Sequence, residues 1–372
     1  MGKKVLLGMS GGIDSSVSAM LLKEQNFDII GMTFRSYDAI SKACMEKETG
    51  CCSVDSIFEA KKLADDFGFP HHILDTRELF ENTVIADFIS QYMAGFTPNP
   101  CVLCNKIIKW GKMLEECDKL NCDFIATGHY AQVASENGRY FLRKGLDKSK
   151  DQSYFLWTLT QDNLKRTIFP LGSLTKSQVR EIALKNNYLK LAQKRESQEI
   201  CFITNDDYRS FLREKVANID KKIGEGNFVD INGKVLGKHK GFPFYTIGQR
   251  KGLEIALGHP AYVVDINSNT NTITLGERED LLSKEMWISN INLMKYESLE
   301  DLDKNVRLTC KIRFRNEGES CKVQQTGDKI KVTFEKPVSA VTPGQSAVIY
   351  ENEDIVGGGI ILNPQLSHLN LT

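Results

Sequence analysis

The chain has 372 residues, a length that predicts two to three domains, and 41% of these residues are hydrophobic, as in an ordinary globular protein. Its 48 lysines and arginines balance its 48 aspartates and glutamates, so bulk charge gives no support to nucleic-acid binding, and any such site must depend on local patches. No window approaches the roughly 20 apolar residues of a membrane span, so we expect a cytoplasmic protein without a leader peptide or a membrane partner.

The first predicted elements are a buried strand over 3–9 and a helix over 16–25, with the turn GMSGGIDS at 8–15 between them. Two adjacent glycines let successive N–H groups point into one hollow, and a helix N-terminus adds unpaired N–H groups, so the turn predicts a phosphate site. It lacks the lysine of a GxxxxGK[ST] loop and carries Asp14, a carboxylate suited to help hold Mg²⁺ beside a triphosphate. The alternative is an ordinary turn with Asp14 as a helix cap.

Strands and helices alternate through the next hundred residues, which predicts a parallel sheet covered by helices. The predicted strands are 28–34, 71–75 and 123–129, and the predicted helices are 53–67, 78–94 and 106–120. Phe34 ends the second strand near the phosphate turn, where open α/β sheets bind ligands, so it is a candidate for stacking on adenine; a core phenylalanine is the alternative. Residues 35–54 are interpreted as an irregular insertion rather than a metal site.

The chain contains ten cysteines, and in a reducing cytoplasm such thiols suit catalysis or metal binding better than a disulfide framework. The segment TPNPCVLCN at 97–105 is predicted to be a loop stiffened by its two prolines. Cys104 would then lie near the N-terminus of a helix beginning at Lys106, a position that favours a thiolate. Thr175 begins a capping box for a helix that ends at Asn186.

The composition shifts near residue 206, and short strands with glycine turns follow over 224–275. Beyond residue 280 we count about six short strands and little helix, which predicts a small barrel or sandwich. Within 306–315 every even position is apolar, so one strand would carry four cations on its other face. Those cations are Arg307, Lys311, Arg313 and Arg315. They form either a phosphate-contacting stripe or a solvated outer face.

Seven motifs together make the chain resemble the tRNA-specific 2-thiouridylases of the PP-loop, or N-type ATP pyrophosphatase, superfamily. The motifs are GMSGGIDS at 8–15, TPNPCVLCN at 97–105, ATGHYA at 126–131, KDQSYFL at 150–156, SQEICF at 197–202, YTIGQRKGL at 245–253 and AVTPGQ at 340–345. The resemblance implies an α/β fold with a parallel-sheet ATP pyrophosphatase domain over 1–205. A small central domain over 206–278 and a C-terminal antiparallel β-barrel over 279–372, which contacts tRNA, would follow.

The resemblance also implies the chemistry. ATP, with Mg²⁺, would adenylate the C2 oxygen of the wobble uridine of a tRNA, and sulfur would replace that oxygen with release of AMP and pyrophosphate. Cys104 matches the family's nucleophile and Cys201 its persulfide carrier. The implied partners are tRNA and a sulfur donor, which could be a cysteine desulfurase, a relay protein or sulfide.

Further site residues follow from matching the family's motifs to this sequence. The motifs imply that ATP is bound by Gly8, Met9, Ser10, Gly11, Gly12, Ile13, Asp14, Ser15 and Gly128, and the place of Phe34 at the end of its strand adds it to these candidates. The residues implied to contact tRNA are Asn99, Pro100, Cys101, His129, Lys150, Asp151, Gln152, Arg313, Arg315 and Gln345. Residues 99–101 match the loop that holds the flipped target base.

One departure leaves the sulfur chemistry open, because many family members carry Asp where this chain has Cys101. The persulfide route could operate unchanged, with Cys101 a spectator or resolving thiol. Alternatively, Cys101, Cys104 and Cys201 could hold a [4Fe–4S] cluster whose open iron binds a sulfide. A thioredoxin-like pair is disfavoured because the CxxC is predicted in a loop between helices, and a Zn²⁺ site lacks an obvious fourth ligand.

Two other classes of function remain as alternatives. Another PP-loop adenylating enzyme, such as an amidating ligase, would need neither Cys104 nor Cys201. An RNA-binding or iron–sulfur scaffold protein that no longer uses ATP would not need the intact turn from Ser10 to Ser15.

Overall fold

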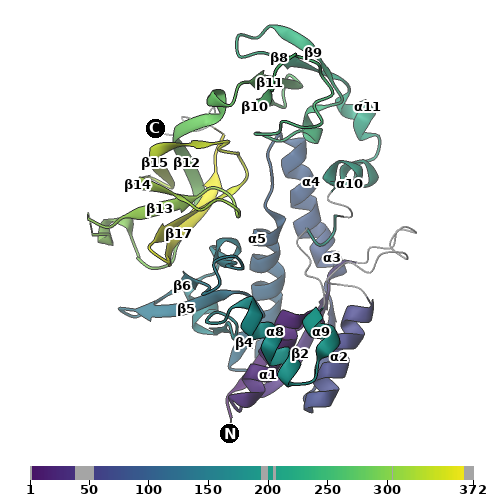
Figure 1. Cartoon of the computed structure of the whole chain (residues 1–372), viewed down its shortest axis with the longest axis vertical. Coiled ribbons are helices and arrows are strands. Elements are labelled where there is room, and N and C mark those ends of the chain that lie inside the picture. The colour runs from purple at the N-terminus through teal and green to yellow at the C-terminus, as the bar shows by residue number, and fades with distance from the viewer. Residues whose placement is uncertain (1, 38–53, 194–199, 204–206, 304, 364–372) are drawn as a thin grey trace.

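The computed structural model describes residues 2–37, 54–193, 200–203, 207–303 and 305–363. The insertion predicted over 35–54 therefore lies mostly outside the described residues. Figure 1 shows a helix-covered sheet at one end, a small β unit at the other, and a β-barrel beside the helices that connect them.

Five parallel strands form the sheet of the first part, in the order β3-β2-β1-β4-β7. They are β1 Lys4–Gly8, β2 Asp28–Arg35, β3 His71–Asp75, β4 Phe124–Ala126 and β7 Thr167–Ile168. Val5, Leu6 and Leu7 of the central strand are fully buried, as expected when helices cover both faces. The predicted parallel sheet is confirmed.

Alternate residues of β1 face different layers of helices. Val5 and Leu7 pack with helices α1, α2, α8 and α9, whereas Leu6 packs on the opposite face against the helical column that contains Trp110. The helices of the first layer are α1 Ile13–Glu24, α2 Val54–Phe67, α8 Lys176–Lys185 and α9 Leu189–Gln193. The predicted capping box at Thr175 is present, because its side chain and that of Gln178 exchange hydrogen bonds with each other's backbone N–H groups.

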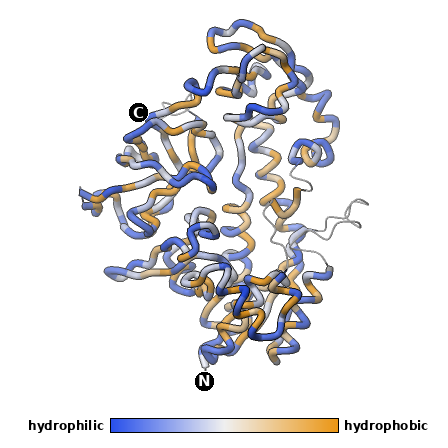
Figure 2. Tube along the Cα trace, in the orientation of Figure 1, coloured by the Kyte–Doolittle hydropathy of each residue, from blue (hydrophilic) through white to orange (hydrophobic). Residues whose placement is uncertain are grey.

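Two long helical columns follow β3, and each contains a π-helical stretch. The first comprises α3 Arg77–Phe80, η1 Glu81–Ile85 and α4 Ala86–Met93, and the second comprises α5 Pro100–Cys104, η2 Asn105–Lys112 and α6 Met113–Lys119. Figure 2 shows hydrophobic residues along the column that contains α4. The predicted loop over 97–105 is wrong from residue 100 onward. Pro100 occupies the first helical position, where its missing N–H costs nothing and its fixed φ suits a helix.

The central part combines two short helices with a four-stranded sheet in the order β10-β11-β8-β9. Its elements are α10 Tyr208–Lys215, α11 Ile219–Ile223, β8 Gly226–Val229, β9 Val235–His239, η5 Phe242–Phe244, β10 Tyr262–Asn267, β11 Thr272–Gly276 and η6 Glu279–Leu281. Phe228 and Val263 form part of a core that continues into the first helical column through Phe88. The helix column therefore supports the central part directly.

Six antiparallel strands form the barrel, which closes through pairing of its first and last strands, β12 and β17. They are β12 Leu282–Leu293, β13 Leu308–Lys311, β14 Glu319–Thr326, β15 Lys329–Ser339, β16 Ser346–Glu351 and β17 Asp354–Ile361, with the 3₁₀ turn η7 Leu299–Asp301 before β13. The predicted barrel is confirmed.

The predicted strand over 306–315 is too long. Leu308, Cys310 and Ile312 alternate as buried residues, but the strand ends at Lys311. Residues 312–318 must reverse the chain so that β14 can pair beside β13, which removes the backbone partners that a longer strand would need. Arg313 and Arg315 therefore lie in a turn, not on a four-cation strand face.

A hairpin of the first part joins the barrel. Its strands, β5 Ala131–Glu136 and β6 Arg139–Lys144, are connected by an Asn-Gly turn in which both residues have positive φ. Strand β6 pairs with β17 at Arg143 and Asp354. Beyond the hairpin, η3 Ser153–Leu156 and α7 Gln161–Lys165 pack in the same core.

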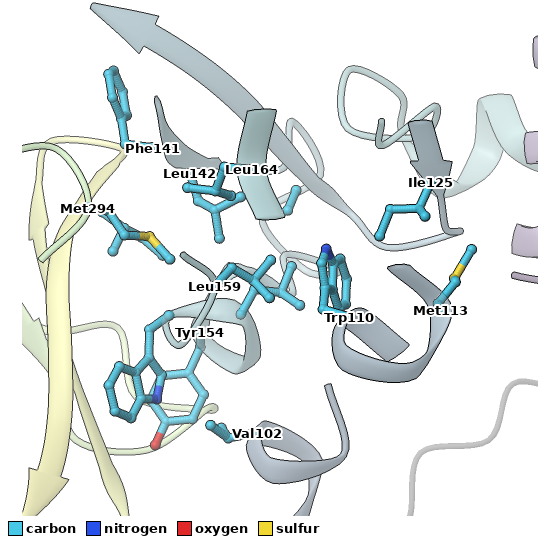
Figure 3. Close-up of a cluster of buried hydrophobic side chains, with 14 of the residues drawn as sticks. Val102, Trp110, Met113, Ile125, Phe141, Leu142, Tyr154, Leu159, Leu164 and Met294 are labelled. Atoms are coloured by element: carbon cyan, nitrogen blue, oxygen red, sulfur yellow. The ribbon is translucent and has the colours of Figure 1, made fainter. Parts of the chain in front are cut away.

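That core belongs to both parts at once. Figure 3 shows Trp110, Leu142 and Tyr154 of the first part together with Met294, which follows the first barrel strand. Val348, Tyr350 and Ile355 of the barrel lie in the same cluster. Tyr154 and Trp157 also donate hydrogen bonds to the carbonyl and the hydroxyl of Ser346.

Candidate active site

The phosphate turn leads from β1 into α1, which begins at Ile13, three residues earlier than predicted. Gly11 has φ of +65°, and a Cβ at this position would lie 2.1 Å from the carbonyl oxygen of Ser56. The hydroxyl of Ser15 accepts the Ser10 N–H at 3.1 Å and donates to the Gly12 carbonyl at 3.1 Å. Only glycine fits the centre of this turn, and the turn's own side chain holds its shape.

Asp14 is not a helix cap, because Gly12 occupies the N-cap position and Asp14 lies two residues inside α1. Its carboxylate oxygens accept hydrogen bonds from the ammonium of Lys176 at 2.7 and 2.9 Å. The hydroxyl of Tyr130 donates to Oδ1 at 2.7 Å. One acidic group, one cation and one phenol thus surround the start of α1.

Gly128 follows β4, the neighbour of β1, and meets the phosphate turn from the other side. A Cβ at this position would lie 2.8 Å from the carbonyl carbon of Asp14 and from the nitrogen of Ser15. The close approach of two backbones explains why glycine is needed here. Phe34 lies near the carboxyl end of β2, half-buried between two of the hydrophobic clusters, which is compatible with either of its predicted roles.

Several residues matched to tRNA contacts also make contacts within the protein. The ring of His129 is buried between Trp110 and Phe169, and its nitrogens contact Thr127 at 2.7 Å and Lys109 at 3.3 Å. Burial, and then the charge of Lys109, lower the pKa of His129 well below its usual value, so the ring is neutral. Its side chain therefore presents no cation to a phosphate.

Asp151 and Gln152 also face inward. The carboxylate of Asp151 is buried and accepts the N–H groups of Gly145 and Ser153, both at 3.1 Å. The amide of Gln152 accepts the N–H of Tyr130 at 3.0 Å. These contacts engage the Asp151 carboxylate and the Gln152 side-chain oxygen within the protein, and they shape the segment that carries half-buried Lys150.

Helix α5 is held at its start by the barrel. The side-chain amide of Gln345 donates to the carbonyls of Thr97 at 3.0 Å and Pro98 at 2.9 Å. The N–H of Thr97 donates to Pro343 at 3.0 Å, and Gly344, with φ of +88°, packs against Phe96 and Thr97. The motifs at 97–105 and 340–345 therefore meet in space.

Two further contacts hold α5 on its inner side. The amide of Asn105 donates to the carbonyl of Phe155 at 3.0 Å, and buried Val102 of the helix packs in the core that contains Tyr154. The ring of Phe155 lies 4.5 Å from that of Phe314 in the barrel turn. The same turn carries exposed Arg313, whose guanidinium donates to the Ser339 carbonyl, and exposed Arg315.

The structure brings the two cysteine segments to one cluster. Half-buried Cys104 packs against the core that contains Phe202 and Ile203, and Ile200 packs against the same core. Phe202 anchors its segment on the helix column through ring contacts with Phe80 at 5.6 Å and Phe88 at 5.3 Å. Cys201, between these apolar anchors, is exposed.

The positions of the thiols correct one expectation and bear on a second. Cys104 is the last residue of α5, so the helix N-terminus lies nearer to half-buried Cys101 than to Cys104. Within the described residues, which include all three thiols, no group of three or more cysteine, histidine or acidic side chains is arranged to hold a metal ion. The [4Fe–4S] hypothesis thus receives no support from this arrangement.

Tyr130 and Lys176 are functional candidates that the sequence reasoning missed. Tyr130 lies within the ATGHYA motif and Lys176 follows the cap residue Thr175, but no local pattern indicates that their side chains reach Asp14. The only hint in the sequence is that the phosphate turn has no lysine, which suggests that a cation reaches the turn from another part of the chain.

Three family models match successive parts of the chain. Residues 3–205 match the model described as tRNA methyl transferase HUP domain, 209–277 match the tRNA methyl transferase PRC-barrel domain, and 283–361 match the aminomethyltransferase beta-barrel domain. Fold and turn together define the chain as a PP-loop enzyme of the ATP-utilising class.

Its relatives narrow this class. The chain is 49% identical to the tRNA-specific 2-thiouridylase MnmA of Cytophaga hutchinsonii over 97% of its length and 98% of that protein. It is also 49% identical to MnmA of Amoebophilus asiaticus, with 96% and 95% covered, and 47% identical to MnmA of Salinibacter ruber, with 97% and 95% covered. The chain belongs to the tRNA-specific 2-thiouridylase family, whose members are tRNA-uridine 2-sulfurtransferases. None of the helices in the described ranges is long and apolar enough to cross a membrane.

Proposed function

We propose that this enzyme uses ATP and Mg²⁺ to adenylate the C2 oxygen of the wobble uridine of tRNA and then replaces that oxygen with sulfur. The observation that carries the proposal is the presence, in one molecule, of a phosphate turn and of two thiols whose segments pack in a common core. A carbonyl oxygen is a poor leaving group until it is converted to a phosphate ester, so a thiolating enzyme needs both features.

The phosphate turn supplies the activation step. The N–H groups at the start of α1 and the positive end of the helix suit the phosphates of ATP, and the Gly11 and Gly128 backbones leave room for close approach. Asp14 is the carboxylate placed to help hold Mg²⁺, which would neutralise phosphate charge. AMP and pyrophosphate are the expected products.

The thiols supply the sulfur. We assign the persulfide to exposed Cys201, which a sulfur donor can reach, and the second thiol to Cys104. The terminal persulfide sulfur forms a bond to C2 as AMP leaves, and it gains two electrons when Cys104 takes its place on Cys201. The products are 2-thiouridine and a Cys104–Cys201 disulfide, which a dithiol reductant must reopen before the next cycle.

The same scheme assigns RNA contacts to groups that reach the surface. Lys150 and the turn containing Arg313 and Arg315 are proposed to contact phosphates, and the segment 99–101 to hold the flipped base. His129, Asp151, Gln152 and Gln345 are proposed to act through the backbone they position, because their side chains are engaged within the protein.

Cysteine variants test the proposal. Cys104→Ala or Cys201→Ala should lower the formation of 2-thiouridine by about 10³-fold or more, because neither thiol can replace the other. Both variants should retain ATP–pyrophosphate exchange in the presence of tRNA. Mass spectrometry of tRNA nucleosides measures the first effect and labelled pyrophosphate the second.

Cys101→Ala, in the same helix, removes the third thiol but keeps the backbone of 99–101 that is proposed to hold the base. Under the persulfide scheme it should retain thiolation within a few-fold, whereas a three-cysteine cluster would lose it as completely as the other variants. An amidating ligase would retain its activity in all three variants and would form no 2-thiouridine. Thiolation that survives in both Cys104→Ala and Cys201→Ala would refute the site assignment.

A further inference from the structure

The phosphate turn contains no lysine, but the fold places one beside it from a distant helix. Lys176 lies 162 residues beyond Asp14 in the chain, and its ammonium lies 2.7 and 2.9 Å from the two carboxylate oxygens. Only 8% of Lys176 is exposed. Burial of an ammonium is costly unless an anion compensates it. The carboxylate of Asp14 is that anion, so the ion pair determines where the Lys176 side chain lies.

The backbone of Lys176 is fixed independently of its ammonium. Its N–H donates to the carboxylate of Asp147 at 3.0 Å, and the capping box at Thr175 sets the first turn of α8. Val179 of α8 packs in the same core as Val17 of α1. The lysine stem is therefore anchored beside the start of α1 whether or not Asp14 binds the ammonium.

Tyr130 completes the arrangement around the ammonium. Its hydroxyl donates to Asp14 at 2.7 Å, and its ring centre lies 5.6 Å from the Lys176 ammonium. The ammonium thus lies between a carboxylate and an aromatic face, both of which favour a cation. The result is a positive charge held at the phosphate turn by groups from α1, α8 and the segment between β4 and β5.

We infer that Lys176 is the phosphate-binding cation of this site and takes the place that the lysine of GxxxxGK[ST] loops occupies in other nucleotide-binding turns. The inference rests on the proposed use of ATP. Asp14 holds the ammonium at the turn until nucleotide binds, and phosphate oxygens then become its partner while the carboxylate becomes available to Mg²⁺. An ammonium and a divalent cation together neutralise the negative charge of a triphosphate better than either cation alone.

Direct binding of radiolabelled ATP by equilibrium dialysis in the presence of EDTA tests this inference without turnover and without Mg²⁺. Lys176→Met should raise the Kd for ATP by about tenfold or more, the usual effect of removing a charge-assisted hydrogen bond. Lys176→Arg should recover part of the loss because it keeps the charge. Lys185→Met, at the exposed end of the same helix, should leave the Kd unchanged.

The outcomes separate the inference from the proposed function. If the wild-type chain binds ATP and folded Lys176→Met binds it equally well, Lys176 only anchors α8 to α1 and the inference is wrong. If the wild-type chain binds no ATP even when Mg²⁺ replaces the EDTA, the proposed function fails.

A second measurement uses the wild-type chain and does not depend on any variant. An acyl-phosphate derivative of ATP transfers its acyl group to a lysine beside the terminal phosphate, forming an amide and releasing ATP. Peptide mass spectrometry should find the label on Lys176, and unmodified ATP should suppress it. Labelling that ATP suppresses but that lies only on other lysines would overturn the inference.

Discussion

Two glycines make the phosphate turn possible for different reasons. Gly11 has a positive φ and has the Ser56 carbonyl where a Cβ would be, whereas Gly128 is not among the residues with positive φ but touches the first turn of α1. An alanine at Gly11 would suffer both backbone strain and a steric clash, whereas an alanine at Gly128 would suffer a steric clash alone. Neither neighbour is a flexible side chain, so the backbone itself would have to move.

We predict that Gly128→Ala will weaken ATP binding by about tenfold or more, because the new Cβ would displace the backbone of Asp14 and Ser15. The change in Kd, measured by equilibrium dialysis, is the readout. Gly138→Ala is the control, since Gly138 has a positive φ but open space around its Cβ position. It should lower stability by about 1 kcal/mol and leave ATP binding intact. Equal ATP affinity in wild type and Gly128→Ala would contradict the proposal that the Gly128 backbone lies beside the bound nucleotide.

At the scale of elements, α5 and η2 form a continuous helical column with the thiols at its start and Trp110 near its end. π-Helical stretches are uncommon and concentrate at functional sites. The start of this column is fixed by a barrel residue distant in sequence, Gln345, rather than by its own neighbours. The position of Cys104 therefore depends on the barrel.

We predict that Gln345→Ala will lower the rate constant for thiolation by about ten- to a hundredfold, because two carbonyls before α5 lose their donor and the start of the helix becomes less well placed. The KM for tRNA should change little. Single-turnover formation of 2-thiouridine is the measurement, and Gln325→Ala, an exposed barrel residue, is the control. An effect confined to KM for tRNA would show instead that Gln345 contacts RNA.

At the scale of the whole molecule, the barrel and the ATP-binding part share one interior. The core around Trp110 and Tyr154 contains Val348, Tyr350 and Ile355 from the barrel, and β6 extends the barrel sheet. The barrel and the first part are therefore separate segments of the sequence, but their side chains pack in one common core. This arrangement has consequences for truncation and for the pH dependence of stability.

We predict that a chain ending at residue 278 will not fold cooperatively, since it would expose the apolar faces of Trp157, Tyr154 and Leu142 that the barrel covers. Thermal unfolding followed by circular dichroism and binding of a hydrophobic dye are the measurements. Coexpression of residues 279–372 as a second chain should restore a cooperative transition. A soluble monomer with a sharp transition in the absence of the barrel would contradict this prediction.

An ion-pair network stabilises the seam between the hairpin and the barrel. The carboxylate of Asp354 contacts the guanidinium of Arg143 at 2.6 Å and the ammonium of Lys295 at 3.0 Å. Lys295 also pairs with Glu351 at 2.8 Å. Burial on its own would raise the pKa of Asp354, but hydrogen bonds from Arg143 and Lys295 outweigh it and hold the pKa below the usual value.

Because its folded-state pKa is depressed, Asp354 stabilises the protein above about pH 3.8, and this contribution disappears as the pH falls through the folded-state pKa. We predict that Asp354→Asn will cost about 1–3 kcal/mol at pH 7 and progressively less as the pH falls below about 3.8. Urea unfolding at several pH values measures the difference. Asp65→Asn, which breaks an exposed pair with Lys61, should cost less than about 1 kcal/mol throughout. A cost for Asp354→Asn that does not change with pH would contradict the assignment.

The sequence by itself determined the elements whose signals are local: the order of the parallel strands and helices along the chain, the glycine turn before α1, the capping box at Thr175 and the β-rich C-terminal part. Periodicity, caps and backbone constraints act over a few residues, so the chain displays them directly. It also indicated Cys104 and Cys201 through motifs, although the helical state of residues 100–105 was missed because prolines suggested a loop.

Only the tertiary structure decided which of these residues meet. The ammonium of Lys176 at Asp14, the amide of Gln345 at Thr97 and the pairing of β6 with β17 each join residues more than a hundred positions apart. It also showed that His129 and Asp151 face inward and that the cationic strand of the barrel ends at Lys311. Such contacts depend on how helices and sheets pack, and no local pattern of residue types records that geometry.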